Sequence, residues 1–324
     1  MKYLCIITFL ILFCVKTYSQ IGGEYVYTFM NIPMGGNNAA LGGGGICSGN
    51  QGVNYLFSNP AMIDSSMNKN IAVNYVDYIS DIHFGSFAFT YHLLKNWNFS
   101  TGVLFANYGT FESTNEAGIQ SGTFYAKDQA IYLSVSRNII KNLDVAISLK
   151  TIFSHLETYK SWGIAFDFGL HYYLPQLGIN IGGVVKNLGF QIKPYTNSNR
   201  EKLPLNIQIG ASKILNHAPL QFLLIFNNLQ HPQLSDEFSQ SLANHLILGL
   251  ELFPKSTVSV KAGMNILQHN ELRVSSTSPF PGFSFGADVK LKRFSVQYSR
   301  ACYSAAASIN MFTVEVFLSK IVDF

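Results

Sequence analysis

Between Leu143 and Asn187 the sequence alternates between apolar residues and residues that are small, polar or charged. Successive side chains of a β-strand point to opposite faces, so a period of two predicts strands with one apolar and one polar face. The pattern breaks at His155–Ser161 and again at Pro175–Gly178, where turn-forming residues gather. This stretch therefore predicts three consecutive strands, and the rest of the chain has to accommodate them.

The same alternation recurs from Ile71 to the end of the chain and predicts about fourteen strands. The expected strands are 71–79, 83–93, 97–107, 128–137, 143–154, 161–173, 177–187, 203–213, 219–228, 244–252, 256–267, 282–291, 292–299 and 309–318. Many of them approach the roughly 9–11 residues of a membrane-spanning strand, whereas strands of soluble sheets usually have about five or six. We predict an all-β chain that forms a single-chain outer-membrane antiparallel β-barrel of about 14 strands, with an N-terminal hatch-like segment.

The lengths of the predicted connections also favour a barrel. From the third strand onward, short and long connections alternate. The short ones are 94–96, 139–142, 174–176, 215–218 and 253–255, and the long polar ones are 109–127, 189–202, 229–243 and 268–281. Outer-membrane barrels have short periplasmic turns and long external loops, whereas a soluble sandwich has no reason to sort its loops in this way.

The first seventy or so residues do not alternate. Residues 1–20 have Lys2 followed by a short apolar run and predict a cleaved signal peptide, which implies export to the cell outer membrane. Residues 21–70 are rich in glycine and predict a hatch in the lumen or a periplasmic segment, with one short helix near Asn38–Leu41. Residues 71–324 are then the transmembrane β-barrel.

Composition supports this interpretation. Charged residues make up 12% of the chain, about half the usual share in soluble proteins, and aromatic residues make up 14%. The formal net charge of +4 is small and spread out, so the sequence does not indicate binding to nucleic acid. Cys47 and Cys302 are the cysteines that remain after signal cleavage, and whether they form a disulfide is left open.

Charged residues of both signs fall on the polar face of neighbouring predicted strands. We expect a lumen charge network with two groups, Lys150, Asp167 and Lys186 in one, and Glu251, Lys261 and Asp288 in the other. A low-dielectric interior disfavours unpaired charge, so these side chains are expected to pair and to stabilise the wall. Conduction or transport through the lumen is the alternative role.

Motifs of catalysis are incomplete in this chain. Ser66 and Lys69 fit the Ser-x-x-Lys pattern of penicillin-recognising enzymes, but the Lys-Thr-Gly motif that such enzymes need is absent. Ser284 lies in a Gly-x-Ser-x-Gly sequence that opens a predicted strand, where a nucleophile elbow needs a strand followed by a helix. The sequence contains no His-Glu-x-x-His or Cys-x-x-Cys pattern, so we expect no enzyme activity, no cofactor and no metal site.

Several short stretches resemble the PorQ family, an outer-membrane component of the type IX secretion system. They are Gln20–Tyr27, Ala40–Gly43, Asn59–Ala61, Asn74–Val76, Tyr108–Phe111, Ser154–Glu157, Ile192–Thr196, Asn199–Glu201 and Leu203–Pro204. The most specific is Ile192–Thr196, and the resemblance is weakest in the last third of the chain. The family is distantly similar to PorV and to FadL-like barrels, which also have about fourteen strands and an N-terminal hatch.

The resemblance implies a non-enzymatic role, in which the barrel anchors a PorZ-like surface protein in an attachment complex with PorU and PorV. That complex joins secreted cargo to lipopolysaccharide, and its catalysis would belong to PorU. The candidate partner-binding residues are Lys193, Tyr195, Arg200 and Glu201, on the expected external loop. The alternative for this loop is that it folds inward and braces the barrel mouth.

The alternative function is a FadL-like outer-membrane transporter of hydrophobic small molecules. It is motivated by the glycine-rich N-terminal segment and by apolar residues at lumen-facing positions, namely Val184, Leu223, Ile225 and Ile247.

Overall fold

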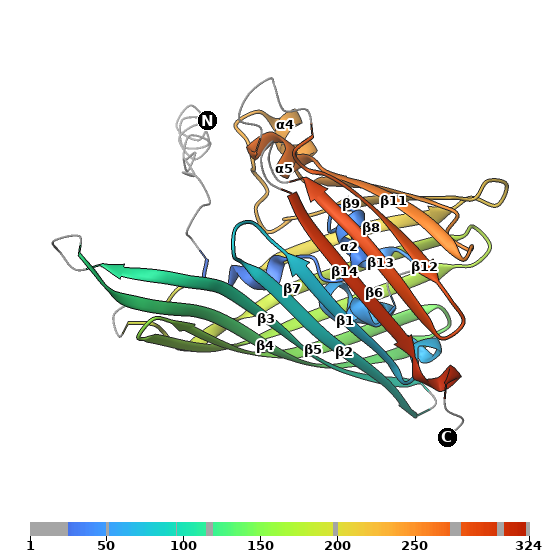
Figure 1. The fold of residues 1–324 in the computed structure, drawn as a ribbon. Helices are drawn as coiled ribbons and strands as arrows, with labels where there is room; N and C mark the ends of the chain where they lie inside the picture. The colour runs from blue at the N-terminus through green and yellow to red at the C-terminus, as the bar shows by residue number, and fades with distance from the viewer. Residues whose placement is uncertain are drawn as a thin grey trace, which may run out of the picture.

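The computed structural model describes residues 25–49, 52–94, 96–114, 119–196, 200–272, 280–302 and 308–321. In this part of the chain, fourteen antiparallel strands form a closed barrel (Figure 1). Each strand pairs with its neighbours in the sequence, and β1 pairs with β14 to close the wall. The predicted fold class is confirmed. The predicted signal peptide, residues 1–20, lies outside the described residues.

Each of the expected strands has a counterpart in the structure. The strands are β1 (Asn70–Asp77), β2 (His83–Leu94), β3 (Trp97–Thr114), β4 (Gln120–Ile140), β5 (Leu143–Leu156), β6 (Tyr159–Leu174), β7 (Ile179–Lys193), β8 (Asn206–Ile214), β9 (Leu220–Phe226), β10 (Leu246–Leu252), β11 (Val258–Asn265), β12 (Phe283–Lys290), β13 (Phe294–Cys302) and β14 (Ser308–Phe317). Among the described residues, none of the helices has the length and apolar character needed to cross a membrane.

The two faces of the wall differ as the alternation predicts. Ile147 and Phe168 pair across β5 and β6 and point outward, where they are 46% and 43% exposed. Lys150 and Asp167 come from the same two strands, point inward and are almost completely buried. The outer surface is therefore apolar over the strands, and the polar side chains are enclosed in the lumen.

The two ends of the barrel are built differently. At one end, short turns such as those between Leu94 and Trp97 and between Ile140 and Leu143 join the strands. Short turns mark the periplasmic end of such barrels, and we call this end periplasmic. The opposite, external end is uneven, because β3 and β4 extend beyond their neighbours while α4 (Phe238–Asn244) and α5 (Ile266–Glu271) lie together above other strands (Figure 1).

Three predicted loops are shorter in the structure than expected. One is 189–202, into which β7 continues as far as Lys193. The stretch Gly109–Lys127 was expected to be a long polar loop, but β3 continues to Thr114 and β4 begins at Gln120. A register shift between Asn107 and Thr110 exchanges the faces of β3, which hides the strand from a search for simple alternation. The expected loop His155–Ser161 is likewise mostly strand, because only 157–158 separate β5 from β6.

A segment of short helices fills the lumen, and we call residues 25–69 the plug (Figure 1). Its elements are η1 (Thr28–Asn31), α2 (Gly36–Ala40), η2 (Gly45–Cys47), η3 (Gly52–Asn54), α3 (Tyr55–Ser58), η4 (Pro60–Met62) and η5 (Ser65–Met67). The helix expected near Asn38–Leu41 corresponds to α2. Most plug residues between Val26 and Ile63 are buried, so this segment forms the core of the barrel.

Candidate functional site

The plug touches the barrel wall on all sides. The helix α2 contacts β11 to β14, η2 contacts β7 and β8, η4 contacts β4 to β6, and η3 contacts β1 and β2. Any solute that crosses the lumen has to pass between these elements and the wall. The candidate functional site is therefore the boundary between plug and wall.

Polar side chains of the wall hold α2. The backbone N–H of Gly36 donates to Thr313 Oγ1 at 2.9 Å, and the N–H of Asn37 donates to Gln297 Oε1 at 3.1 Å. Asn37 Nδ2 also donates to Asp288 Oδ2 at 3.2 Å. These bonds satisfy the N–H groups of the first helical turn, which have no partner within the helix.

A buried glutamate of β14 holds η3. Glu315 Oε1 accepts hydrogen bonds from the Val53 N–H at 3.2 Å and from Asn70 Nδ2 at 3.5 Å. Gly52 lies against this carboxylate with a φ of 59°, and a Cβ at this position would overlap the carboxylate oxygens. Glycine is required here both by the left-handed backbone and by the close approach.

The opposite side of the plug meets an apolar part of the wall. Ile46 and Cys47 of η2 form a buried cluster with Val184, Ile225 and Ile247. Leu223, the fourth apolar residue expected in the lumen, is buried as well. The plug thus covers the apolar lumen residues that the sequence places on β7, β9 and β10.

On this side, Ser212 and Asn59 donate hydrogen bonds to backbone carbonyl groups. Ser212 of β8 donates to the Cys47 carbonyl at 2.7 Å, and Asn59 Nδ2 donates to the carbonyls of Ile46 and Leu170 at 3.0 and 3.1 Å. Burial raises the pKa of Cys47 to about 12, so its thiol stays protonated. Cys47 and Cys302 are both free, which settles the open question of a disulfide between them.

Wall glycines let the plug come close, a feature that sequence reasoning missed. A Cβ on Gly263 of β11 would overlap the backbone of Leu41 and Gly42, and one on Gly169 of β6 would overlap Asn59. Glycine inside a strand often marks a close approach of another backbone. Both glycines occupy inward positions of the alternation, which is the signal that could have revealed them.

Each of the two groups of the predicted charge network contains one ion pair. Lys150 Nζ lies 2.7 Å from Asp167 Oδ2 and 2.6 Å from Asn187 Oδ1, and it also lies 4.9 Å from the centroid of the Tyr132 ring. On the other side of the lumen, Lys261 Nζ lies 3.1 Å from Glu251 Oε1.

The other two residues of the predicted network, Lys186 and Asp288, lie within electrostatic reach of these pairs. Asp288 bonds to Asn37 of the plug. Lys186 is half-buried, and among the described residues it forms no ion pair with Asp167. Residues of the network therefore bond to one another within the wall, and Asp288 also bonds to the plug.

The candidate partner-binding residues do not form one cluster. Lys193 ends β7, and with Arg200 and Glu201 it is exposed at the external end. Tyr195 turns inward instead, and its hydroxyl donates to Ser154 Oγ. The loop is tied to the plug, because the Val26 N–H donates to the Lys202 carbonyl at 3.0 Å. Tyr195 and Lys202 of this loop thus contact the wall and the plug, whereas Lys193, Arg200 and Glu201 stay exposed.

The two serines of the partial catalytic motifs have structural surroundings. Ser66 lies in the short 3₁₀ turn η5, where its hydroxyl donates to Asp64 Oδ1 at 2.5 Å. Ser284 faces the lumen, accepts a hydrogen bond from the Gly42 N–H and donates to the Ala40 carbonyl, both at 2.9 Å. Within the described residues, no group of three or more His, Cys, Asp or Glu side chains could hold a metal ion.

Solved structures with the same architecture are outer-membrane barrels. The CymD monoaromatic hydrocarbon channel matches with a TM-score of 0.54 and 12% identity, over 88% of this chain and 97% of that one. The toluene transporter TodX from Pseudomonas putida matches with a TM-score of 0.51 and 12% identity, over 87% and 96%. A FadL homologue from Pseudomonas aeruginosa matches with a TM-score of 0.51 and 10% identity, over 88% and 97%.

The chain is an outer-membrane β-barrel. This outcome confirms the predicted localisation and the predicted likeness to FadL-like barrels at the level of fold. Identities this low carry no more than the fold. No protein-family model matches the chain, and no curated protein matches it.

The buried pair of Lys150 and Asp167 leads to a test of stability. Replacing Lys150 by Met removes one partner and leaves a buried carboxylate, so we expect a loss of about 3–5 kcal/mol in the free energy of unfolding. The double variant Lys150→Met with Asp167→Leu should recover most of this loss, because it leaves no unpaired charge. Urea unfolding in lipid vesicles measures the free energy of unfolding of the wild type, of Lys150→Met and of the double variant.

Lys213→Met is the control for that experiment, because Lys213 is exposed on β8 and, among the described residues, makes no ion pair. A loss as large for Lys213→Met as for Lys150→Met would contradict the special role of the pair.

The close approach at Gly263 leads to a test of how the plug is seated. In Gly263→Ala the new methyl group would overlap the backbone of Leu41, and overpacking of this kind costs about 1–3 kcal/mol. We expect the plug to leave its position more often, by about 5- to 150-fold in the equilibrium, and the ion conductance of the barrel in planar bilayers to rise.

Gly183→Ala is the control, because a Cβ there meets nothing closer than the Gln208 carbonyl at 4.0 Å. Equal conductance in the two variants and the wild type would contradict the prediction.

Proposed function

We propose that this barrel carries hydrophobic small molecules across the outer membrane. The observation that supports this function best is the apolar contact between η2 of the plug and the wall, where Ile46 packs against Val184, Ile225 and Ile247. The matched structures include a monoaromatic hydrocarbon channel and a toluene transporter, which have the same barrel architecture. A plugged lumen with an apolar contact surface suits ligands that do not carry charge or a hydration shell.

A ligand that enters the lumen substitutes its own contacts for those between the plug and the wall. An apolar molecule that inserts beside Ile46 replaces one apolar contact by another, so little hydrophobic free energy is lost. The hydrogen bonds that hold this side are those of Ser212 and Asn59, whereas α2 and η3 remain bonded on the opposite side. We infer that η2 is the part of the plug that moves and that the route runs along β7 to β10.

A disulfide lock tests this route. Ser212 Oγ lies 2.7 Å from the Cys47 carbonyl oxygen and its hydroxyl contacts the Cys47 thiol, so Ser212→Cys places a second thiol beside Cys47. After oxidation with copper–phenanthroline, η2 is tied to β8 and we expect uptake of radiolabelled toluene by barrel-containing vesicles to fall to the level of empty vesicles. Reduction with dithiothreitol should restore it.

The Ser212→Ala variant, treated with the same reagents, is the matched control and should transport under both conditions. Uptake that continues through the fully oxidised Ser212→Cys barrel would exclude movement of η2. Absence of uptake in the wild type, for toluene and for oleate, would exclude the transport function itself.

A second function is favoured by the resemblance to the PorQ family together with the exposure of Lys193, Arg200 and Glu201 at the external end. We propose in this case that the barrel is a non-enzymatic anchor for a PorZ-like surface protein in a type IX attachment complex with PorU and PorV. The exposed residues of both charge signs at the rim suit a polar protein surface.

Deletion of the gene tests this anchor. We expect a surface partner to appear in the culture medium after deletion, and the triple variant Lys193→Ala, Arg200→Ala and Glu201→Ala to weaken its recovery with the solubilised barrel. A matched variant at the periplasmic end, Lys255→Ala, should leave recovery unchanged. Full retention of surface proteins after deletion would contradict the anchor function.

A further inference from the structure

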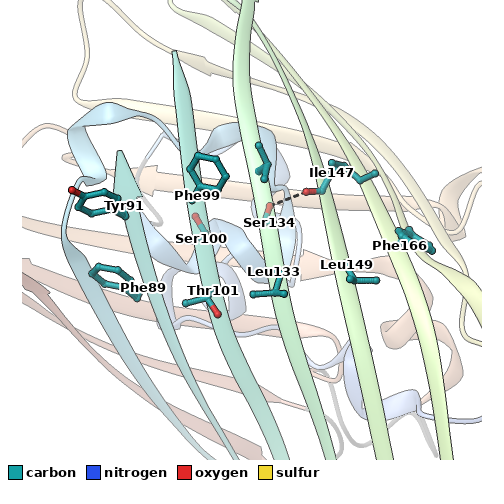
Figure 2. Close-up of a pocket in the computed structure, with 11 residues that line it drawn as sticks. Phe89, Tyr91, Phe99, Ser100, Thr101, Leu133, Ser134, Ile147, Leu149 and Phe166 are labelled. Carbon is teal, nitrogen blue, oxygen red and sulfur yellow. Dashed lines mark hydrogen bonds between the residues drawn. The ribbon is translucent and has the colours of Figure 1, made fainter. Parts of the chain in front are cut away.

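The lipid-facing wall contains an apolar groove of about 480 Å³ that neither proposed function uses (Figure 2). It crosses β2 to β6, and its outward side chains form two rows along the paired registers of these strands. The row nearer the periplasmic end contains Tyr91, Phe99, Val135 and Ile147, and the next row contains Phe89, Thr101, Leu133, Leu149 and Phe166.

The groove is hollow because of one small side chain in the second row. Thr101 stands between Phe89 on β2 and Leu133 on β4, with which it is paired in register. Its larger neighbours form the sides of a trough, and Ser100 and Ser134, which face the lumen, contribute to its floor (Figure 2). The trough faces the hydrocarbon of the membrane, so an acyl chain is the apolar body available to fill it.

A cationic side chain lies directly beyond the periplasmic end of the groove. Trp97 of β3 pairs with Arg137 of β4. This pair lies two residues nearer the periplasmic end than the pair of Phe99 and Val135, and all four side chains share the outer face. Two residues of a strand correspond to about 7 Å, so Arg137 lies just past the first row. The Arg137 guanidinium lies over the Trp97 ring, 4.7 Å from its centroid.

This pair has the chemistry of a membrane interface. Tryptophan rings are enriched at the level of lipid headgroups, and arginine binds phosphate through paired hydrogen bonds. Arg137 is exposed, and within the described parts of the chain no carboxylate lies at ion-pair distance from it. Its charge is therefore available to an anionic group outside the protein.

We propose that the groove and Arg137 form a binding site for one phospholipid of the periplasmic leaflet. The phosphate of the headgroup binds the Arg137 guanidinium beside Trp97, and one acyl chain lies in the trough over Thr101. Charge complementarity selects an anionic headgroup. Arg137 lies toward the periplasmic end and the trough lies deeper in the membrane, which is the order of phosphate and acyl chain in a lipid of the periplasmic leaflet. The bound lipid packs against β2 to β6 and fills the hollow in the wall.

Native mass spectrometry of the full-length barrel tests this site, with dioleoyl phosphatidylglycerol added to the detergent-purified protein. We expect one tightly bound lipid in the wild type. Arg137→Gln should weaken its binding about tenfold, because a charge-assisted bond to the phosphate is lost. Thr101→Phe should remove the bound lipid by filling the trough.

Matched controls lie elsewhere on the same barrel. Arg293→Gln removes an exposed arginine from the turn between β12 and β13 at the same end, and Thr151→Phe enlarges an outward threonine of β5 that does not line the groove. Both should bind lipid as the wild type does. Heat-modified migration on gels shows that each variant has closed as a barrel before it is measured.

Three results would overturn the proposal. Equal lipid binding by all five proteins would show that the groove holds no specific lipid. Loss of lipid in Arg293→Gln as well as in Arg137→Gln would show attraction to net charge alone. A mass of two barrels without lipid, reduced by Thr101→Phe, would assign the groove to a second copy of the chain.

Discussion

The whole structure depends on the need to pair every backbone N–H and C=O group in a medium that offers no water. In the hydrocarbon of a membrane an open sheet edge is not tolerated, so the first and last strands have to meet. They do so through a register that joins Asn70 to Phe317 and Asp77 to Asn310 along the full length of β1. Closure of the sheet encloses a lumen. Because polar side chains line this lumen, it has to be filled by protein groups or by water.

The plug meets this second requirement. It offers backbone N–H groups to Thr313, Gln297 and Glu315 and carbonyl groups to Ser212, so wall groups that would otherwise need water find partners in the protein. Buried polar groups are costly unless they are bonded, and a plug with short helices and turns has many unpaired backbone groups to offer. The irregular structure of this segment is thus suited to a polar wall.

The sequence predicted the barrel well because alternation in a membrane wall is enforced at each position by lipid on one side and the lumen on the other. It failed where that constraint ends. Beyond the register shift at Asn107 and Thr110, β3 and β4 extend past the other strands and the alternation of β3 changes phase, so the sequence predicts a loop for the end of β3. The residues of α4 and α5 lie outside the wall altogether, and their helices were not predicted.

The contacts of the candidate site could likewise be predicted from the sequence only in part. The pairs Lys150 with Asp167 and Glu251 with Lys261 follow from neighbouring strands, since pairing of strands brings inward residues together. The bond of Asp288 to Asn37 does not follow, because it joins residues far apart in the sequence through the placement of the plug. No local pattern encodes that placement. Inward glycines such as Gly263 mark only where the wall can be approached.

The two sides of the plug differ in a way that bears on how the lumen could open. To lift α2 away from the wall, the bonds to Thr313, Gln297 and Asp288 must be broken in a poorly hydrated space, where each unpaired group costs about 1–3 kcal/mol. On the side of η2, apolar contacts of Ile46 dominate, and an apolar ligand can replace them one for one. A polar solute has no such compensation on either side. This asymmetry is the reason why we propose that hydrophobic molecules enter along β7 to β10.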